Sequence, residues 1–547
     1  MSHRVHSRLP SQDHDLDDVA TTTDPDIVAA YLDDAAHFPG GHATALARPR
    51  SEGAVAELVK SAGTLLPIGA QSSLTGGATP MGDTLVAMAG LDRLTAIGES
   101  RLTAQAGVPI RVIQEELSRR GAFYPPAPTY DGAFAGGVIA TNAAGATTFK
   151  YGSTRDWVQG LTVVLASGRV LDLERGQAHA HSDGYFEIVD DGHITRVPIP
   201  SYQMPNVPKR SAGYFAAPGM DLVDLFIGSE GTLGIVTEAS FRVVPQRPLT
   251  CLLWLTIPDE PTALALVASL RREAQATWRS HDTRGVDVAA IEHLDRRSVE
   301  ILREDGADRT HGVRLPLDTA VALIAQVELP PGSFTTGDEA YAQIADAQAA
   351  DAPDTPLVRL CRLMAQASLL DRAEIVLPHD HRRQSQILAL REAVPEAVNR
   401  RVAEARRLSP EIQKTAADMI VSFDRFEESL ELFRGAFDRY SLDYAIWGHI
   451  SDGNVHPNVI PHRPEDVQRG QDAIVTCGRE IIAMGGCPLA EHGVGRNPVK
   501  QQLLLELYGE GGIEQMRCVK RALDPTWRLA PGVLFSQARR RLSYTSC

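Results

Sequence analysis

Short apolar runs that alternate with glycine, proline and aspartate dominate the first half of the chain. Runs such as Leu65–Ile68, Leu85–Met88 and Leu161–Ala166 have the length of strands, and turn-forming residues end each one. The segments Glu52–Lys60 and Ile110–Arg120 instead place apolar residues at helical spacing. This part of the chain therefore predicts a mixed α+β domain.

From about residue 247 onward, longer stretches with helical spacing separate the apolar runs. Four of these runs have strand character: Cys251–Ile257, Ala373–Leu377, Tyr444–Ile450 and Val455–Ile460. Helices that alternate with such strands predict a second α+β domain, in which helices cover an antiparallel sheet.

Charge and composition exclude several classes of function. The formal net charge is −15, and no run of Lys and Arg with interleaved aromatic residues occurs, so we expect no nucleic-acid partner. No stretch is apolar over the length that crosses a bilayer, so we expect no transmembrane segment. The N-terminus lacks the apolar core of a secretory signal, and the six cysteines include no C-x-x-C pair. We therefore expect a cytoplasmic protein, and peripheral contact with the inner face of the membrane stays open.

Three glycine-rich clusters are the most informative motifs. The first, Pro67–Gly77, follows a predicted strand, and its glycines, small residues and hydroxyls let backbone N–H groups approach a phosphate. The second, Gly136–Gly145, has almost no bulky side chains, so a flat ligand such as a flavin ring can lie along it. The third, Gly228–Thr237, is a turn that runs into a strand. One such cluster is often only a turn, whereas three in one domain favour a bound ligand.

A predicted hairpin places two histidines together. Asp452-Gly453 lies between two apolar runs, which is the strongest short hairpin signal. If these two residues form the whole turn, His449 lies directly opposite His456, with Cβ atoms about 4.5–5.5 Å apart. Two imidazoles on one face can converge on a metal ion.

A carboxylate strengthens the metal hypothesis, because two histidines alone are more often ordinary polar residues. Glu491-His492 supplies one, and two histidines with one carboxylate leave positions on the ion open for substrate. Adjacent side chains point in different directions, so we expect only one of this pair to bind the ion.

The clusters, with Lys209 and Gly213-Tyr214 upstream of the third, resemble the FAD-binding domain of the vanillyl-alcohol-oxidase superfamily. The branch they resemble contains D-lactate dehydrogenase, the glycolate oxidase flavin subunit and D-2-hydroxyglutarate dehydrogenase. No cysteine or histidine is placed to tether the cofactor, so the resemblance implies non-covalent FAD. The implied FAD contacts are Pro67, Gly69, Ala70, Gln71, Ser72, Ser73, Thr75 and Gly76 in the first cluster, then Pro128, Thr129, Gly136, Gly137, Ala140, Thr141, Asn142, Glu230, Gly234, Ile235 and Val236.

The resemblance also implies a fold class and a domain organisation. The fold class is α+β, with a two-subdomain FAD-binding domain of the vanillyl-alcohol-oxidase type and an α+β substrate (cap) domain built on an antiparallel sheet. The expected divisions are a mobile polar tail over 1–24, the FAD-binding domain over 25–246, the cap domain over 247–490 and a segment returning to the FAD domain over 491–547.

Metal-using members of this family bind the ion through the two histidines of an A-H-x-G-D-G-N-x-H-x-N stretch and the glutamate of G-E-H-G. The resemblance therefore implies that His449, His456 and Glu491 bind a divalent ion, either zinc, manganese or iron. The histidine after the glutamate is the base in those members, which implies this role for His492. Ser451 and Ala490 stand where the pattern has glycine, and neither change removes a ligand.

The enzymes of the branch that the chain resembles act on 2-hydroxy acids. The carboxylate of such a substrate needs a cation, and a bidentate arginine is the best partner. Arg391 and Lys414 match regions where relatives place a substrate-binding arginine and lysine. The alternative, that both are surface helix charges, is equally well supported by the sequence.

Together these features imply FAD-dependent oxidation of a D-2-hydroxy acid, of the D-lactate, glycolate or 2-hydroxyglutarate type, to the 2-keto acid by hydride transfer to flavin N5. The implied partners are this small-molecule substrate and a separate electron acceptor (protein, quinone or oxygen), and a homodimer stays open. Alternatives on the same fold are another FAD-linked alcohol or sugar oxidase and an alkyl-glycerone-phosphate synthase-like enzyme. Alternatives from other classes are a non-haem metal oxygenase and a non-catalytic flavin-binding protein.

Overall fold

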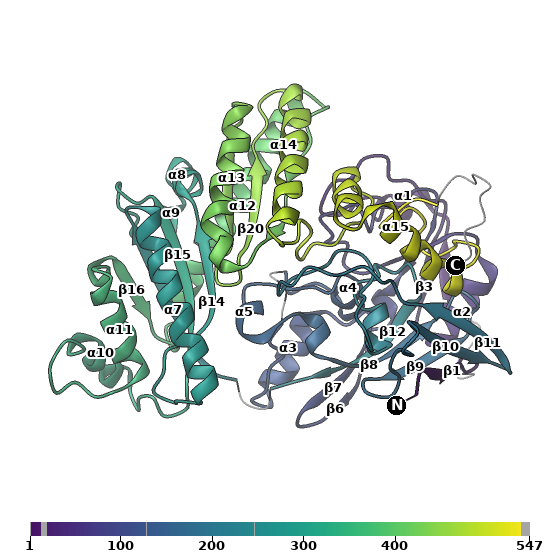
Figure 1. Cartoon of the computed structure of the whole chain (residues 1–547), viewed down its shortest axis with the longest axis horizontal. Coiled ribbons are helices and arrows are strands. Elements are labelled where there is room, and N and C mark those ends of the chain that lie inside the picture. Colours follow the sequence, from purple (N-terminus) through teal and green to yellow (C-terminus); the bar gives the residue numbers. More distant parts are fainter. Residues whose placement is uncertain (1, 12–18, 127, 129, 245–246, 538–547) are drawn as a thin grey trace. The chain divides into compact units, whose positions relative to one another are not determined.

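The computed structural model describes residues 2–11, 19–126, 128, 130–244 and 247–537. The chain divides into two compact units (Figure 1): unit 1 contains 1–145, 152–247 and 487–547, and unit 2 contains 146–151 and 248–486. The chain thus leaves unit 1 twice. The first departure is the six-residue segment 146–151, which the domain boundaries predicted from the sequence place inside the FAD-binding domain. Within the predicted mobile tail the structure forms two short strands, while residues 1 and 12–18 lie outside the described part.

The described residues of unit 1 form three small sheets. One has the order β2-β3-β5-β4, in which β5 pairs in parallel with both β3 and β4. A second is antiparallel with the order β6-β7-β12-β8-β9, and a third has the order β1-β10-β11. The strands are β1 (Arg4–His6), β2 (Val19–Thr22), β3 (Leu46–Pro49), β4 (Leu65–Ile68), β5 (Thr84–Ala87), β6 (Leu94–Ile97), β7 (Arg101–Gln105), β8 (Val158–Val164), β9 (Val170–Glu174), β10 (Tyr185–Asp190), β11 (His193–Pro198) and β12 (Ile235–Arg242).

The helices of unit 1 follow from local sequence signals. Helix α2 begins after Ser51, whose hydroxyl accepts the backbone N–H of Ala54, and it buries Val55 and Val59 in the core. Most of the other helices are short. The helices are α1 (Pro25–Ala29), α2 (Glu52–Ser61), α3 (Ile110–Ser118), α4 (Ala135–Ala140), α6 (Val223–Phe226) and α15 (Pro498–Leu523).

The C-terminal segment returns to unit 1, as the long helix α15 shows in yellow in Figure 1. After this helix, the backbone of Leu65 donates to Arg528 and accepts from Ala530, each at 2.7 Å. The buried ammonium of Lys520 donates to the carbonyl of Thr232 at 2.6 Å. These bonds fix the returning segment beside the strands that carry the first and third glycine clusters.

Unit 2 contains an antiparallel sheet of eight strands in the described residues, with the order β16-β13-β15-β14-β19-β20-β17 and β18 also paired to β20. Its central strands are mostly apolar and almost wholly buried. The strands are β13 (Leu249–Ile257), β14 (Asp287–Leu294), β15 (Val321–Leu329), β16 (Ala373–Val376), β17 (Thr415–Ala416), β18 (Met419–Ile420), β19 (Tyr444–His449) and β20 (Asn454–Val459).

Amphipathic helices cover this sheet. Trp254 and Ile324 of the sheet share one buried cluster with Leu390 and Val394 of helix α12. Helices α13 and α14 lie side by side, in light green in Figure 1. The helices are α5 (Thr148–Tyr151), α7 (Glu260–Ser280), α8 (Arg296–Glu304), α9 (Ala307–Thr310), α10 (Gly337–Ala345), α11 (Pro356–Gln366), α12 (His381–Leu408), α13 (Phe426–Arg439) and α14 (Pro464–Ala483).

The α+β fold class that the sequence predicts is confirmed. Every strand and helix named from the hydrophobic pattern forms within a few residues of its predicted bounds, as β4 and α2 illustrate. The structure also contains the central strands β14 and β15, which the hydrophobic pattern did not predict. Among the described residues, no helix combines the length and apolar character that a membrane crossing requires.

Candidate functional site

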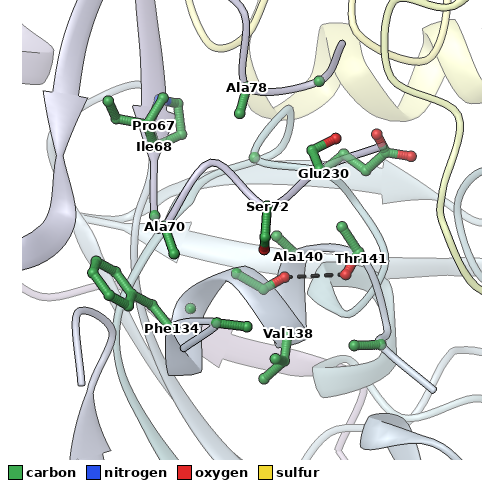
Figure 2. A pocket seen from close by; sticks show the side chains of 18 of the residues that line it. Pro67, Ile68, Ala70, Ser72, Ala78, Phe134, Val138, Ala140, Thr141 and Glu230 are labelled. Carbon is green, nitrogen blue, oxygen red and sulfur yellow. Dashed lines mark hydrogen bonds between the residues drawn. The ribbon is translucent and has the colours of Figure 1, made fainter. Parts of the chain in front are cut away.

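A cavity of about 300 Å³ in unit 1 collects the three glycine clusters. Figure 2 shows its wall: Ala70 and Ser72 come from the first cluster, Ala140 and Thr141 from the second, and Glu230 from the third. The predicted cofactor residues that line it are Pro67, Gly69, Ala70, Gln71, Ser72, Ser73, Pro128, Gly136, Gly137, Ala140, Thr141, Glu230, Gly234, Ile235 and Val236. Loops from distant parts of the chain therefore line one cavity.

Glycine is required in this wall for two different reasons. A Cβ on Gly136 would lie 2.8 Å from the Cβ of Ala106, so this glycine lets α4 pack closely against its neighbour. A Cβ on Gly137 would meet no atom within 4 Å, although Gly137 lines the cavity. The cavity beside Gly137 is thus open, and a side chain at this position would occupy part of the space available to a ligand.

Three predicted cofactor residues are not among the lining residues. Thr75 is buried, its hydroxyl is 2.9 Å from that of Ser73, and a Cβ on Gly495 would collide with it. Gly76 adopts a φ of 73° against the ring of Phe38. The side-chain oxygen of Asn142 accepts the backbone N–H of Arg155 at 2.9 Å. Thr129 lies outside the described residues.

Aromatic and aliphatic residues that the sequence analysis did not select as cofactor contacts complete the wall. Three of them lie within the glycine clusters and the others lie between or beside them, so their place in or near the clusters was the only signal. They are Ile68, Leu74, Met88, Tyr130, Phe134, Val138 and Phe226.

The predicted base lies at the same cavity. Glu491 and His492 both line it, although almost the whole of unit 2 separates them from the glycine clusters in sequence. The Nε2 atom of His492 is 3.5 Å from Oε1 of Glu491. Unit 1 thus places an imidazole, a group that can accept or donate a proton, at the same cavity as the three clusters.

Glu230 holds the chain that follows His492. Its two carboxylate oxygens accept the backbone N–H groups of Val494 and Gly495, each at 2.8 Å. Burial raises the pKa of this carboxyl to about 7, and the two N–H donors oppose that rise. The sequence analysis placed Glu230 near the cofactor but did not foresee this contact.

A buried lysine compensates the charge of Glu491. The side chain of Lys209 is fully buried, and its Nζ lies 3.1 Å from Oε2 of Glu491. The neighbouring Ser211 donates its backbone N–H to the carbonyl of Ala490 at 2.9 Å. A carboxylate removed from water needs such a cation, so Lys209 compensates the charge of Glu491 and fixes its position.

The histidine hairpin of unit 2 forms in a different register from the predicted one. His449 pairs with Asn454 and His456 with Trp447, so four residues instead of two make the turn. The prediction that the two histidines lie directly opposite each other is wrong, because Asp452-Gly453 forms only the second half of that longer loop. The histidines remain diagonal neighbours on one face, with ring centroids 5.3 Å apart.

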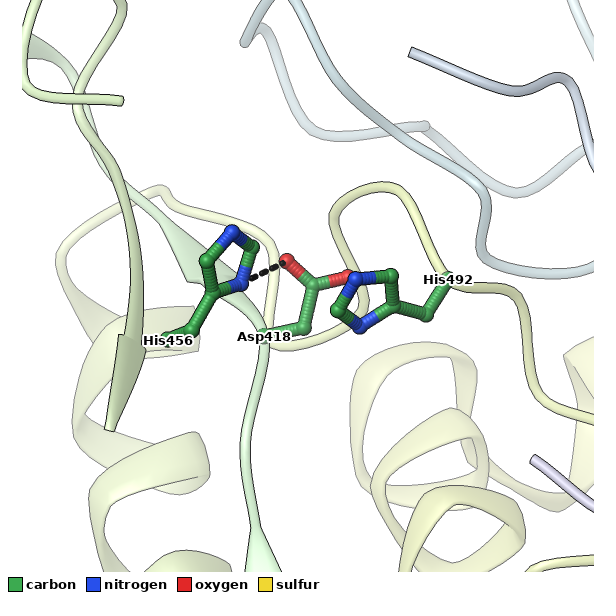
Figure 3. A group of neighbouring side chains, drawn as sticks. All are labelled: Asp418, His456 and His492. Atoms are coloured by element: carbon green, nitrogen blue, oxygen red, sulfur yellow. Dashed lines mark ion pairs between the residues drawn. The ribbon is translucent and has the colours of Figure 1, made fainter. Parts of the chain in front are cut away.

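Each histidine of the hairpin has a buried carboxylate at Nδ1. The Nδ1 atom of His449 is 2.9 Å from Oε1 of Glu292, and that of His456 is 3.4 Å from Oδ1 of Asp418 (Figure 3). Histidines that bind metal commonly have such a carboxylate on the far nitrogen, which leaves the Nε2 lone pair for the ion. The chemistry of these residues therefore fits a divalent metal.

The predicted substrate cations occupy different environments in unit 2. Arg391 of α12 is largely buried, with Nε 3.4 Å from Oε2 of Glu292 and Nη1 3.0 Å from Glu392. Lys414 is half-buried and directly precedes β17. Arg391 thus contacts the same carboxylate as His449, that of Glu292. Because its side chain is largely buried, Arg391 is not a surface helix charge.

The sequence matches two family models. Residues 258–534 match the C-terminal domain of FAD linked oxidases, and residues 43–174 match the FAD binding domain. Three curated relatives extend this likeness over most of the chain. They are D-2-hydroxyglutarate dehydrogenase from Xanthomonas citri pv. viticola (28% identical; 86% of this chain, 84% of the relative), glycolate oxidase subunit GlcD from Bacillus subtilis (27%; 87% and 85%) and D-lactate dehydrogenase from Archaeoglobus fulgidus (25%; 85% and 84%).

Solved structures show the same fold at lower sequence identity. The 4-ethylphenol oxidase of Gulosibacter chungangensis, in complex with isoeugenol, matches with a TM-score of 0.62 at 17% identity, over 94% of both chains. An alkyldihydroxyacetonephosphate synthase matches with a TM-score of 0.58 at 15% identity, over 96% of this chain and 85% of that one.

Proposed function

We propose that this chain, which belongs to the family of FAD-linked oxidases, oxidises a D-2-hydroxy acid to the corresponding 2-keto acid. The observation that carries the proposal is that His492 lines the same cavity as the three glycine clusters. The relatives named as D-2-hydroxyglutarate and D-lactate dehydrogenases support this substrate class. Membership in a FAD-linked family argues against a non-haem oxygenase and against a non-catalytic protein.

The cavity of unit 1 is the binding site that we propose for FAD. When bound, FAD supplies a hydride acceptor at its flavin N5 atom. The backbone and small side chains of the three clusters would hold it, and the apolar wall residues Ile68, Phe134 and Val138 would exclude water from the cavity.

Proton transfer falls to His492 in this proposal. As the Cα hydride leaves the substrate, the hydroxyl proton moves to the imidazole of His492, which must be neutral to accept it. Glu230 fixes the backbone two and three residues further on, so the position of this imidazole is maintained through the cycle.

The carboxylate of the substrate is bound by Arg391 and Lys414 in this proposal. A guanidinium can contact both oxygens of a carboxylate, which fixes the orientation of the acid as well as its charge. We further propose that His449, His456 and Glu491 bind a divalent ion, which would supply Lewis-acid polarisation of the substrate oxygens.

Electrons then leave to a separate acceptor, either a protein, a quinone or oxygen. The six cysteines of this chain include no C-x-x-C pair that would suggest an iron–sulfur relay.

Anaerobic mixing of the purified flavoprotein with a panel of D- and L-2-hydroxy acids tests the proposal. A D-2-hydroxy acid should bleach the flavin absorbance, whereas its L-enantiomer and simple alcohols should not. In the His492→Ala variant FAD should remain bound while bleaching slows by at least about 100-fold, and the His193→Ala variant, which changes an exposed histidine of unit 1, should behave as wild type. Bleaching by sugars or phenols alone would overturn the assignment.

A further inference from the structure

We propose that Glu292 is a positioning residue that sets the orientation of His449 and of Arg391 together, and so couples metal affinity to substrate affinity. The inference rests on the proposed function, because it concerns the residues that we assign to the ion and to the substrate carboxylate. It adds a residue that neither the sequence motifs nor the glycine clusters identify.

The sheet of unit 2 brings Glu292 to the hairpin. Strand β14 lies between β15 and β19, and Glu292 is the direct partner of His449 across the β14–β19 pair. Paired residues project from the same face of a sheet, which directs the carboxylate at the imidazole. The resulting distance from Oε1 to Nδ1 is 2.9 Å.

The second oxygen of the same carboxylate faces the arginine. Oε2 of Glu292 lies 3.4 Å from Nε of Arg391, which reaches it from helix α12. The side chains of Glu292 and Arg391 are only 7% and 11% exposed, and that of His449 is fully buried. Because water is largely excluded, these contacts are stronger than the same contacts at a surface.

Glu292 determines which nitrogen of His449 can bind an ion. A neutral imidazole that donates from Nδ1 to a carboxylate presents its lone pair at Nε2 and becomes a better ligand. Asp418 has the same relation to His456, but its Oδ1 also accepts a hydrogen bond from Asn454 at 3.0 Å, and its distance to the histidine is longer. Glu292 is therefore the more strongly engaged of the two carboxylates.

Sharing one carboxylate makes the two functions interdependent. The cation of Arg391 withdraws charge from Glu292, which weakens its effect on His449. Loss of Arg391 should thus tighten metal binding, and loss of the Glu292 charge should weaken both metal binding and the fixation of Arg391.

The test is the Glu292→Gln variant of the full-length flavoprotein. Release of zinc or manganese to a chromophoric chelator should show an affinity about 10- to 100-fold below that of wild type. The KM for the 2-hydroxy acid should rise as well, while FAD content is unchanged. Glu328→Gln is the matched control, because Glu328 is a buried carboxylate of the same sheet that binds Lys150 and Tyr151 instead.

The Arg391→Met variant distinguishes coupling through Glu292 from a general loss of structure. It also tests the inference if Glu292→Gln folds poorly. It should bind the ion more tightly than wild type, and this gain should shrink when Glu292→Gln is also present. Equal metal affinity in wild type and Glu292→Gln, or an Arg391→Met effect that is the same in both backgrounds, would overturn the inference. Wild type that binds no divalent ion would instead refute the metal site of the proposed function.

Discussion

Glu230 accepts the backbone N–H of Val494 at 2.8 Å, and through this contact the third glycine cluster fixes the chain that carries His492. The second oxygen of the same carboxylate accepts the N–H of Gly495 at an equal distance. A Cβ on Gly493 would lie 2.8 Å from the carboxylate, so the loop can approach only as glycine. The cavity wall and the segment that carries the proposed base are thus directly connected within unit 1.

The Glu230→Gln variant tests this connection. A glutamine accepts only one of the two N–H groups and turns its own NH₂ toward the other. One of the two hydrogen bonds is therefore lost, at a cost of about 0.5–1.5 kcal/mol, which rises to about 1.5–3 kcal/mol above pH 7, where Glu230 is ionised. We expect flavin reduction by substrate to slow by about 10- to 100-fold in stopped-flow absorbance measurements, with little change in the substrate concentration at half-saturation.

The matched control for this variant is Asp83→Asn. Asp83 is a buried carboxylate that binds Nη2 of Arg496 at 3.0 Å, one residue beyond the Glu230 contact. We expect this change to lower stability while flavin reduction stays close to wild type. Reduction at the wild-type rate in Glu230→Gln would show that the loop keeps its position without the carboxylate.

The Gly137→Val variant tests where FAD binds. The open space around Gly137 accommodates a larger side chain without a collision, so the protein should fold. The valine would fill part of the cavity wall, and we expect FAD affinity to fall by more than about tenfold, or 1.4 kcal/mol, in a fluorescence titration. The exposed Gly63 also has no atom near its Cβ position, so Gly63→Val should bind FAD as wild type does. Full FAD occupancy in Gly137→Val would place the cofactor elsewhere.

Local chemistry made part of this molecule predictable from sequence. The strand β4 and helix α2 follow from their apolar spacing and from the Ser51 cap, both of which act over a few residues. Small-residue clusters likewise indicate a ligand-lining backbone without any knowledge of the fold, and the structure gathers most of their residues around one cavity.

Long-range pairing made the rest unpredictable. Glu292 lies 157 residues before His449 in sequence, and only the β14–β19 pairing brings them together. Glu292 and His293 follow the apolar run 288–291 and resemble the polar end of a strand, so the pattern gave no reason to select Glu292. The hairpin register failed for a related reason, since Ser451 binds the backbone of Ile291 in β14 and helps to hold the longer turn.

The Lys209–Glu491 ion pair should show strong energetic coupling. Removing one member of a buried pair typically costs about 3–5 kcal/mol, because the remaining charge loses its compensation. We expect Lys209→Met and Glu491→Gln each to lower the denaturant midpoint followed by tryptophan fluorescence. The double variant should lose less stability than the sum of the single losses, by at least about 1 kcal/mol. Strictly additive losses would mean that the two charges are stabilised independently.

Stability at acid pH should depend on His293. Burial lowers its pKa to about 4, neither ring nitrogen has a hydrogen-bond partner in the described part of the chain, and the charges acting on it are those of Glu260, Arg434 and Glu292. The unfolded chain binds this proton below pH about 6.5 and the folded chain only below about 4, so about 3 kcal/mol of stability is lost as the pH falls between these values. His293→Leu should lack this loss in thermal unfolding measured from pH 7 to 4, whereas His193→Leu, at an exposed site, should retain it. Parallel pH profiles for wild type and His293→Leu would mean that the histidine is protonated equally in both states.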